Sequence, residues 1–127
     1  MKIAFAGAFS IQLAAPVEAR LSLPCEIIEG DEDGIVSRLG DVDVLVSMGY
    51  SQAMADAAPN LKLVQVPGAG LDRVDRDALR PETNLANVYG HEVGIAEYVI
   101  GTMIALTRSF ASLDSNLRRG IWESHWA

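Results

Sequence analysis

Short apolar runs alternate with stretches of helical spacing along the first ninety residues, and this alternation most constrains the fold. The apolar runs are the expected strands, at residues 3–6, 25–28, 42–47, 61–66 and 84–87. Helical spacing is found between them, at residues 14–21, 32–39, 52–57 and 76–79. Strands separated by helices need crossover connections, which make neighbouring strands parallel. The pattern therefore predicts one parallel sheet.

The run at 42–47 is unbroken and β-branched, as is typical of a strand buried on both faces. We therefore expect an α/β fold with a flavodoxin-like five-stranded parallel sheet, helices on both faces, and the strand order 2-1-3-4-5. In such sheets ligands bind at the carboxyl ends of the strands. Three of the expected strand ends are rich in glycine, which lets a ligand approach the backbone closely.

From Val93 onward the sequence differs in kind. One apolar stripe at spacings of three and four comprises Ile95, Val99, Met103, Leu106, Phe110, Leu113 and Leu117. Ala96, Ile100 and Ile104 add a second apolar face. These spacings predict one long C-terminal helix over residues 93–117, about 35 Å in length. A helix that is apolar on two sides needs more cover than one sheet, so we expect it to contact a second domain or to form a homodimer.

Composition excludes several classes of function. The chain has 127 residues, a net charge of −7 and no dense cluster of Lys or Arg, so nucleic acid is not an expected partner. The longest apolar stretch, residues 93–106, contains Glu97 and is too short to span a bilayer, so no membrane is expected either. Residues 1–9 imitate a secretory signal, but Ser10 and Gln12 interrupt the run. The default expectation is a cytoplasmic protein.

Cysteine and histidine are scarce. Cys25 is the single cysteine, and His91 and His125 are the two histidines, so we expect neither a disulfide nor a metal site. His91 follows an expected strand and precedes the long helix. It could donate a hydrogen bond to a substrate, or it could simply start the helix with Glu92. The sequence favours neither role over the other. We expect His125 at a surface or an interface.

Gly68-Ala69-Gly70 lies at the end of the fourth expected strand. Successive backbone N–H groups there could hold a carboxylate or a phosphate. Spacing alone favours a plainer alternative, a tight turn in which the glycines supply positive φ angles. The motif is not a dinucleotide fingerprint, because Arg73 stands where the third glycine of G-x-G-x-x-G would fall.

Residues 61–75 read LKLVQVPGAGLDRVD, and Asn87 follows some twelve residues later. Ile95-Ala96-Glu97 then opens the long helix, which reaches Leu106-Thr107-Arg108. These two blocks resemble the "LK…GxGxDxVD" and "N…G…VAEh…R" segments of the D-isomer-specific 2-hydroxyacid dehydrogenases. The resemblance covers essentially the whole chain.

The resemblance implies an NAD- or NADP-dependent oxidoreductase with a flavodoxin-like substrate domain, here residues 1–92, followed by an interdomain or dimerisation helix, here residues 93–127. It implies that the backbone N–H groups of Gly68, Ala69 and Gly70 hold the carboxylate of a small 2-oxo or 2-hydroxy acid. It also places Ser47 and Met48 at the substrate pocket. His91 is implied at the substrate, and Ile95 beside the nicotinamide.

The family's catalytic Arg, Glu and His and its Rossmann cofactor domain lie C-terminal to the matched segment. We therefore expect no catalytic residue and no tightly bound cofactor in residues 1–127. The leading interpretation is the N-terminal, substrate-binding part of such an enzyme, truncated and inactive alone. The alternative is a stand-alone module that binds carboxylates or dimerises without catalysis. A reading frame that continues past the codon for Ala127 would separate the two.

Overall fold

The computed structural model describes residues 1–122. It divides into two compact units, Met1–Tyr89 and Gly90–Ala127, which are described separately. The division falls three residues before the boundary expected from the sequence, and helix α4 begins two residues into the second unit. His125 lies outside the described residues.

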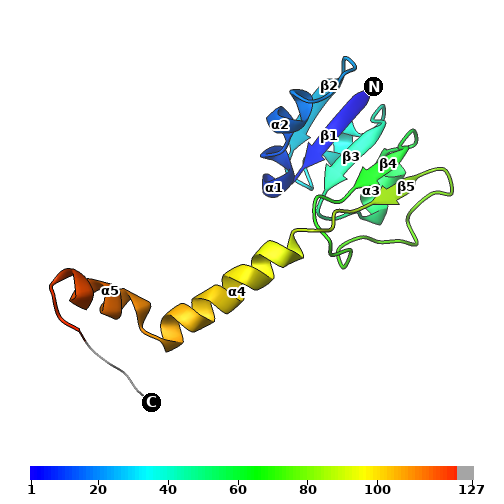
Figure 1. The fold of residues 1–127 in the computed structure, drawn as a ribbon. Helices are drawn as coiled ribbons and strands as arrows, with labels where there is room; N and C mark the ends of the chain where they lie inside the picture. The colour runs from blue at the N-terminus through cyan, green and yellow to red at the C-terminus, as the bar shows by residue number, and fades with distance from the viewer. Residues whose placement is uncertain (123–127) are drawn as a thin grey trace. The chain divides into compact units, whose positions relative to one another are not determined.

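The first unit is built on a five-stranded sheet in which every pairing is parallel (Figure 1). Its strands are β1 (Lys2–Ala6), β2 (Glu26–Gly30), β3 (Val44–Ser47), β4 (Leu63–Gln65) and β5 (Asn84–Ala86). They lie in the order β2-β1-β3-β4-β5. The predicted fold class and strand order are confirmed, because the order reverses between β1 and β3 as in a flavodoxin-like sheet.

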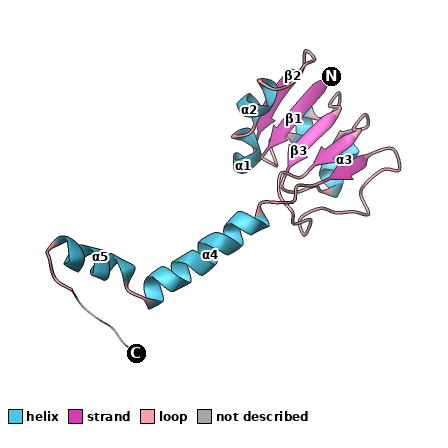
Figure 2. Cartoon of the chain, viewed as in Figure 1, coloured by secondary structure: helices cyan, strands magenta, loops and turns pink. Residues whose placement is uncertain are grey.

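Both faces of the sheet are covered, by helices that Figure 2 shows in cyan. Alternate residues of β1 enter two separate cores, with Ala4 in one and Phe5 in the other. The Phe5 core is covered by α1 (Ala8–Ile11) and α2 (Ala14–Glu18), and the Ala4 core by the 3-10 helix η1 (Val36–Arg38) and by α3 (Gln52–Ala57). Complete burial of a side chain such as Phe5 contributes about 2–3 kcal/mol.

Two of the helices that the sequence predicted are absent from the structure. Residues 32–39 form turns followed by the short η1, because Gly34 weakens a helix and its N–H instead donates to the Asp31 carboxylate at 2.5 Å. Residues 76–79 form only a turn, in which the Asp77 N–H donates to the Asp75 side chain. Such local side-chain bonds compete with helix formation.

The second unit contains α4 (Glu92–Thr107) and α5 (Phe110–Arg118). The long C-terminal helix is thus present, but its predicted extension to residue 117 is wrong. Ser109 has a φ of 51°, in the left-handed region, and the two helices meet at an angle of 58°. The Ser109 N–H donates to the Leu106 carbonyl, and the Ser109 carbonyl then accepts from Leu113 in α5. An apolar stripe shows helical spacing on both sides of such a break and does not reveal it.

Within this unit the apolar side chains of α4 are not buried. Ile95 is 57% exposed and Met103 is 63% exposed. Over residues 1–122 no single helix is long and apolar enough to cross a bilayer, although α4 and α5 together, across their bend, reach that length and composition.

Candidate functional site

The loop that follows β4 contains Gly68, Ala69 and Gly70, at the carboxyl edge of the sheet. The carbonyl groups of Gly68 and Ala69 accept hydrogen bonds from the segment that follows β5. The Val88 N–H donates to the Gly68 carbonyl at 3.1 Å, and the Asn87 side-chain amide donates to the Ala69 carbonyl at 2.9 Å. The loop is therefore held from one side, through its acceptors.

The backbone N–H groups of the loop differ from its carbonyl groups in this respect. Within residues 1–122, the N–H groups of Gly68, Ala69 and Gly70 donate to no protein acceptor. Neither glycine has a positive φ, so the tight-turn interpretation of this motif is wrong. Peptide N–H groups without a protein acceptor can hydrogen-bond an anion.

Met48 lies against this loop. A Cβ built on Gly68 would stand 3.2 Å from Cε of Met48, which is tighter than ordinary contact. The same construction at Gly70 meets only Oδ2 of Asp72, at 3.5 Å. Gly68 is thus accounted for by the packing of Met48, whereas neither conformation nor crowding accounts for Gly70. An approaching ligand would need the space that a side chain at Gly70 would fill.

Ser47 is fully buried at the end of β3. Its hydroxyl accepts a hydrogen bond from the Gly49 N–H at 3.2 Å, which shapes the loop that carries Met48. The structure therefore brings Met48 and the glycine loop together, whereas Ser47 is buried and its hydroxyl is used by the Gly49 N–H.

The loops after β3 and β4 are also joined to each other. The Tyr50 N–H donates to the Arg73 carbonyl at 3.0 Å, and the Asp75 N–H donates to the Tyr50 carbonyl at 2.8 Å. Tyr50 is 3% exposed, and burial raises the pKa of its hydroxyl. These bonds join the loops after β3 and β4 at the carboxyl edge of the sheet.

An ion pair crosses the same edge. Nη2 of Arg73 lies 2.5 Å from Oε2 of Glu32, a residue that follows β2. Gly7, at the end of β1, has a φ of 84°, and a Cβ placed on it would stand 3.1 Å from Oε1 of Glu32. The pair therefore passes over the end of β1.

His91 and Ile95 belong to the second unit. His91 directly precedes α4, is exposed, and its side chain makes no capping hydrogen bond. The Glu92 carboxylate accepts from the N–H of Gly90, just before the helix, at 2.7 Å. The backbone N–H groups of Glu92 itself and of Gly90 lower the pKa of the Glu92 carboxyl.

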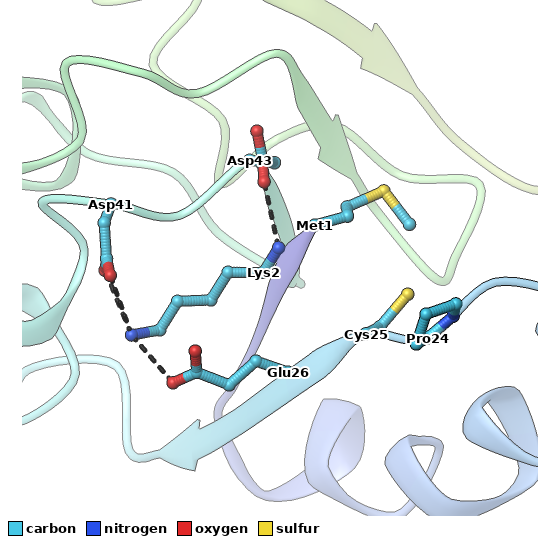
Figure 3. A pocket seen from close by; sticks show the side chains of 7 residues that line it. All are labelled: Met1, Lys2, Pro24, Cys25, Glu26, Asp41 and Asp43. Atoms are coloured by element: carbon cyan, nitrogen blue, oxygen red, sulfur yellow. Dashed lines mark hydrogen bonds and ion pairs between the residues drawn. The ribbon is translucent and has the colours of Figure 1, made fainter.

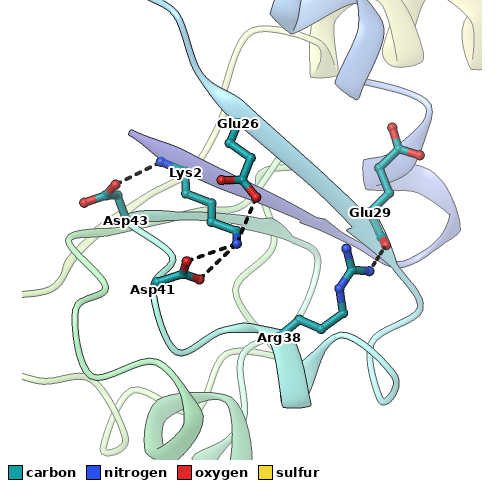
Figure 4. A network of polar contacts seen from close by, with 6 residues as sticks. All are labelled: Lys2, Glu26, Glu29, Arg38, Asp41 and Asp43. Atoms are coloured by element: carbon teal, nitrogen blue, oxygen red, sulfur yellow. Dashed lines mark hydrogen bonds and ion pairs between the residues drawn. The ribbon is translucent and has the colours of Figure 1, made fainter.

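The opposite edge of the sheet carries a polar network. Nζ of Lys2 lies 3.0 Å from carboxylate oxygens of both Glu26 and Asp41 (Figure 4). The Lys2 N–H donates to Asp43 at 2.9 Å, and Lys62 pairs with the same carboxylate at 2.6 Å. Because these residues stand at the amino ends of the parallel strands, the network joins strand starts.

An open cavity of about 450 Å³ adjoins this network, with Met1, Pro24 and Cys25 on its wall (Figure 3). The charges beside it are already paired. The hydrogen bonds of Asp43 with the Lys62 side chain and the Lys2 N–H lower the pKa of its carboxyl. Hydrogen bonds to Glu26 and Asp41 raise the pKa of Lys2. The charged residues at the amino edge of the sheet are therefore accounted for by structural ion pairs.

The glycine loop at residues 68–70 does not fit the pyrophosphate of a dinucleotide. A pyrophosphate site needs a helix that starts directly after the glycine loop, but a turn follows Gly70 at residues 72–73. Among residues 1–122 no group of three metal-ligating side chains comes together either.

Sequence reasoning missed the roles of Glu32, Tyr50 and Arg73 at the carboxyl edge of the sheet. Their common signal is a place within a few residues of a strand's carboxyl end. That signal becomes usable once the strand order is known.

Together, the sheet order and the donor-rich loop define an α/β domain whose carboxyl edge is suited to binding a small anion. No protein-family model matches the chain. The sequence is 32% identical over 108 residues to hydroxypyruvate reductase of Thermotoga maritima and 30% identical over 104 residues to formate dehydrogenase of Candida boidinii. The predicted resemblance to the D-isomer-specific 2-hydroxyacid dehydrogenases is thereby confirmed over most of the chain.

The fold agrees with this relationship. A 2-hydroxyacid dehydrogenase from Ketogulonicigenium vulgare superimposes with a TM-score of 0.69 over 94% of this chain, at 24% identity. The matches cover 81% and 75% of this chain but 35% and 29% of the two relatives named above, and 39% of the solved structure. The chain therefore spans about a third of the length of the proteins it matches.

Proposed function

We propose that residues 1–127 form the N-terminal, substrate-binding part of an NAD- or NADP-dependent oxidoreductase that acts on the CH–OH group of D-2-hydroxy acids in the cytoplasm. The carboxylate of the substrate is held by the N–H groups of Gly68, Ala69 and Gly70, with Met48 against its carbon chain. The single observation that carries this proposal is the set of three N–H donors that have no acceptor within residues 1–122, in a loop whose Gly68 and Ala69 carbonyls are already hydrogen-bonded.

The names of the relatives support the substrate class. Hydroxypyruvate and formate, which the two relatives' names contain, each carry one small carboxylate. Backbone donors at a strand end suit such a group because they provide hydrogen bonds without a bulky side chain.

Hydride transfer needs a nicotinamide held against the substrate and an acid–base group within hydrogen-bond reach. Residues 1–127 contain no G-x-G-x-x-G. We therefore assign these residues substrate binding, with Ile95 beside the nicotinamide of the complete active site, and we expect no oxidation of NADH by this chain alone with glyoxylate.

We also propose that the chain forms a homodimer through the exposed apolar side chains of α4. Ile95, Val99 and Met103 follow one another at spacings of four residues, so they make a continuous stripe along the helix. Burial of such a stripe in a symmetric interface would remove it from water.

The experiment that tests the substrate site is a titration of the isotope-labelled chain with glyoxylate, followed through amide chemical shifts. The amides of Ala69 and Gly70 should shift in a saturable way, whereas the amide of Gly40, in an open position elsewhere in the chain, should not. Amides at 68–70 that do not respond to glyoxylate would refute the proposed site.

A further inference from the structure

A second feature of the carboxyl edge is not used by the carboxylate loop. An open cavity of about 220 Å³ lies among the residues that follow β2, β3 and β4. Its polar wall is formed by Glu32, Asp33, Tyr50, Ser51 and Arg73. The proposed grip on the carboxylate needs none of these side chains.

The cavity lies where the strand order of the sheet reverses. From β1 the chain crosses outward to β2, while β3, β4 and β5 extend in the other direction. The Glu32–Arg73 pair passes over the end of β1, and Gly49 follows the end of β3. In open parallel sheets, the crevice at this switch point is the place where ligands bind.

The cavity and the glycine loop are close neighbours. Met48 contacts Gly68 on one side, and the adjacent Gly49 lines the cavity on the other. Adjacent strands lie about 5 Å apart, so the loops after β3 and β4 are separated by the length of a short carbon chain. A ligand whose carboxylate rests on the glycine loop can therefore extend its other end into the cavity.

The charges around the cavity are unequal. Glu32 and Asp33 bring two carboxylates, and Arg73 brings one guanidinium, which is already paired with Glu32. Among the described residues Asp33 makes no ion pair. The cavity thus carries one excess negative charge, which repels a second carboxylate and attracts a cation.

We propose that this cavity is the subsite for the far end of the 2-hydroxy acid, and that it selects a cationic or neutral polar end group over an anionic one. The inference rests on the proposed function, because it places the ligand's first carboxylate on the glycine loop. It assigns Glu32, Asp33 and Arg73 as the residues that determine specificity.

Three ligands of equal carbon number test the selection: D-4-amino-2-hydroxybutanoate, the β-amide of D-malate, and D-malate itself. Their far ends are cationic, neutral and anionic. Titrations of the 127-residue chain should shift the amides of Gly49, Tyr50 and Ser51 together with those of Ala69 and Gly70. The amine should bind most tightly, and D-malate about threefold to tenfold more weakly than its amide, as one extra like charge near the surface requires.

Two substitutions should change this order in opposite directions. Glu32→Gln neutralises the cavity and frees Arg73, so D-malate should bind at least as tightly as its amide. Arg73→Gln makes the cavity more negative, so the discrimination against D-malate should increase about threefold or more. Glu18→Gln and Arg76→Gln alter the same charges at exposed positions outside the cavity and should leave the order unchanged.

The outcomes separate the two proposals. If the amides of Ala69 and Gly70 respond to all three ligands with equal affinity and those of Gly49–Ser51 stay still, the subsite is overturned and the substrate site stands. If no ligand shifts either set, both proposals fail. An unchanged ligand order in both Glu32→Gln and Arg73→Gln would also overturn the assigned selectivity.

Discussion

The side-chain amide of Asn87 donates to the carbonyl of Ala69 at 2.9 Å, so the segment after β5 holds the loop after β4. The neighbouring Val88 N–H holds the Gly68 carbonyl in the same way. Both bonds use acceptors of the loop and leave its donors free. The arrangement presents an anion with donors that are already oriented, which reduces the entropy that binding would otherwise lose.

Asn87→Ala should weaken both the fold and ligand binding, by similar free energies. Loss of one neutral hydrogen bond costs about 1 kcal/mol of unfolding free energy, and a loosened loop should reduce glyoxylate affinity about fivefold. Urea unfolding and the chemical-shift titration measure the two effects. Asn60→Ala is the matched control, because Asn60 donates to the Gly40 carbonyl at 3.0 Å and lies outside the site. Equal losses of affinity in both variants would remove the special role of Asn87.

Gly70→Ala should fold normally and bind anions poorly. The new Cβ meets only Oδ2 of Asp72, at 3.5 Å, and the backbone φ suits alanine, so unfolding free energy should change by less than about 1 kcal/mol. The methyl group would occupy the path of the ligand, so we expect at least about a tenfold loss of glyoxylate affinity. Gly40→Ala, with open space around it, is the control. Wild-type affinity in Gly70→Ala would show that the glycine is not kept for a ligand.

The sequence predicted the sheet well because burial on two faces leaves a direct record in the residues. The apolar runs of β1 and β3 needed no knowledge of distant contacts. The turns at 76–79 and the break at Ser109 were missed because each depends on hydrogen bonds that a periodic pattern does not encode. The glycine loop was recognised, whereas Glu32 and Arg73 are 41 positions apart and become neighbours only through the strand order.

Ser10→Ala should stabilise the first unit. Ser10 is 1% exposed, and its hydroxyl has no hydrogen-bond partner among the described residues. Removal of a buried hydroxyl without a partner avoids its desolvation cost, so the unfolding free energy should rise by about 1 kcal/mol. Urea unfolding measures the change, with Ser37→Ala on an exposed serine as the control. A destabilised Ser10→Ala would show that the hydroxyl has a partner, such as a bound water.

The free energy of unfolding should fall in acid as the Asp43 carboxylate becomes protonated. The Lys62 side chain and the Lys2 N–H lower the pKa of this carboxyl in the folded chain. A lowered folded-state pKa adds stability that is complete above the unfolded value, near 3.8, and is lost as pH falls through the folded value. The gap in urea midpoint between wild type and Asp43→Asn should therefore be constant from pH 7 to about pH 5 and should shrink below about pH 4. Asp77→Asn, at an exposed carboxylate, is the control, and a gap that persists unchanged at pH 3 would contradict the assignment.

Met103→Asp should reduce self-association of the chain. Met103 is 63% exposed and lies in the apolar stripe of α4, so a dimer formed through this stripe would have to bury the new carboxylate. Sedimentation velocity should show the wild-type chain as a dimer or larger species and the variant shifted toward the monomer, by at least about tenfold in dissociation constant. Ser115→Asp adds the same charge at an exposed polar position of α5 and should leave association unchanged. An identical sedimentation profile for wild type and Met103→Asp would mean that α4 does not form the interface between copies.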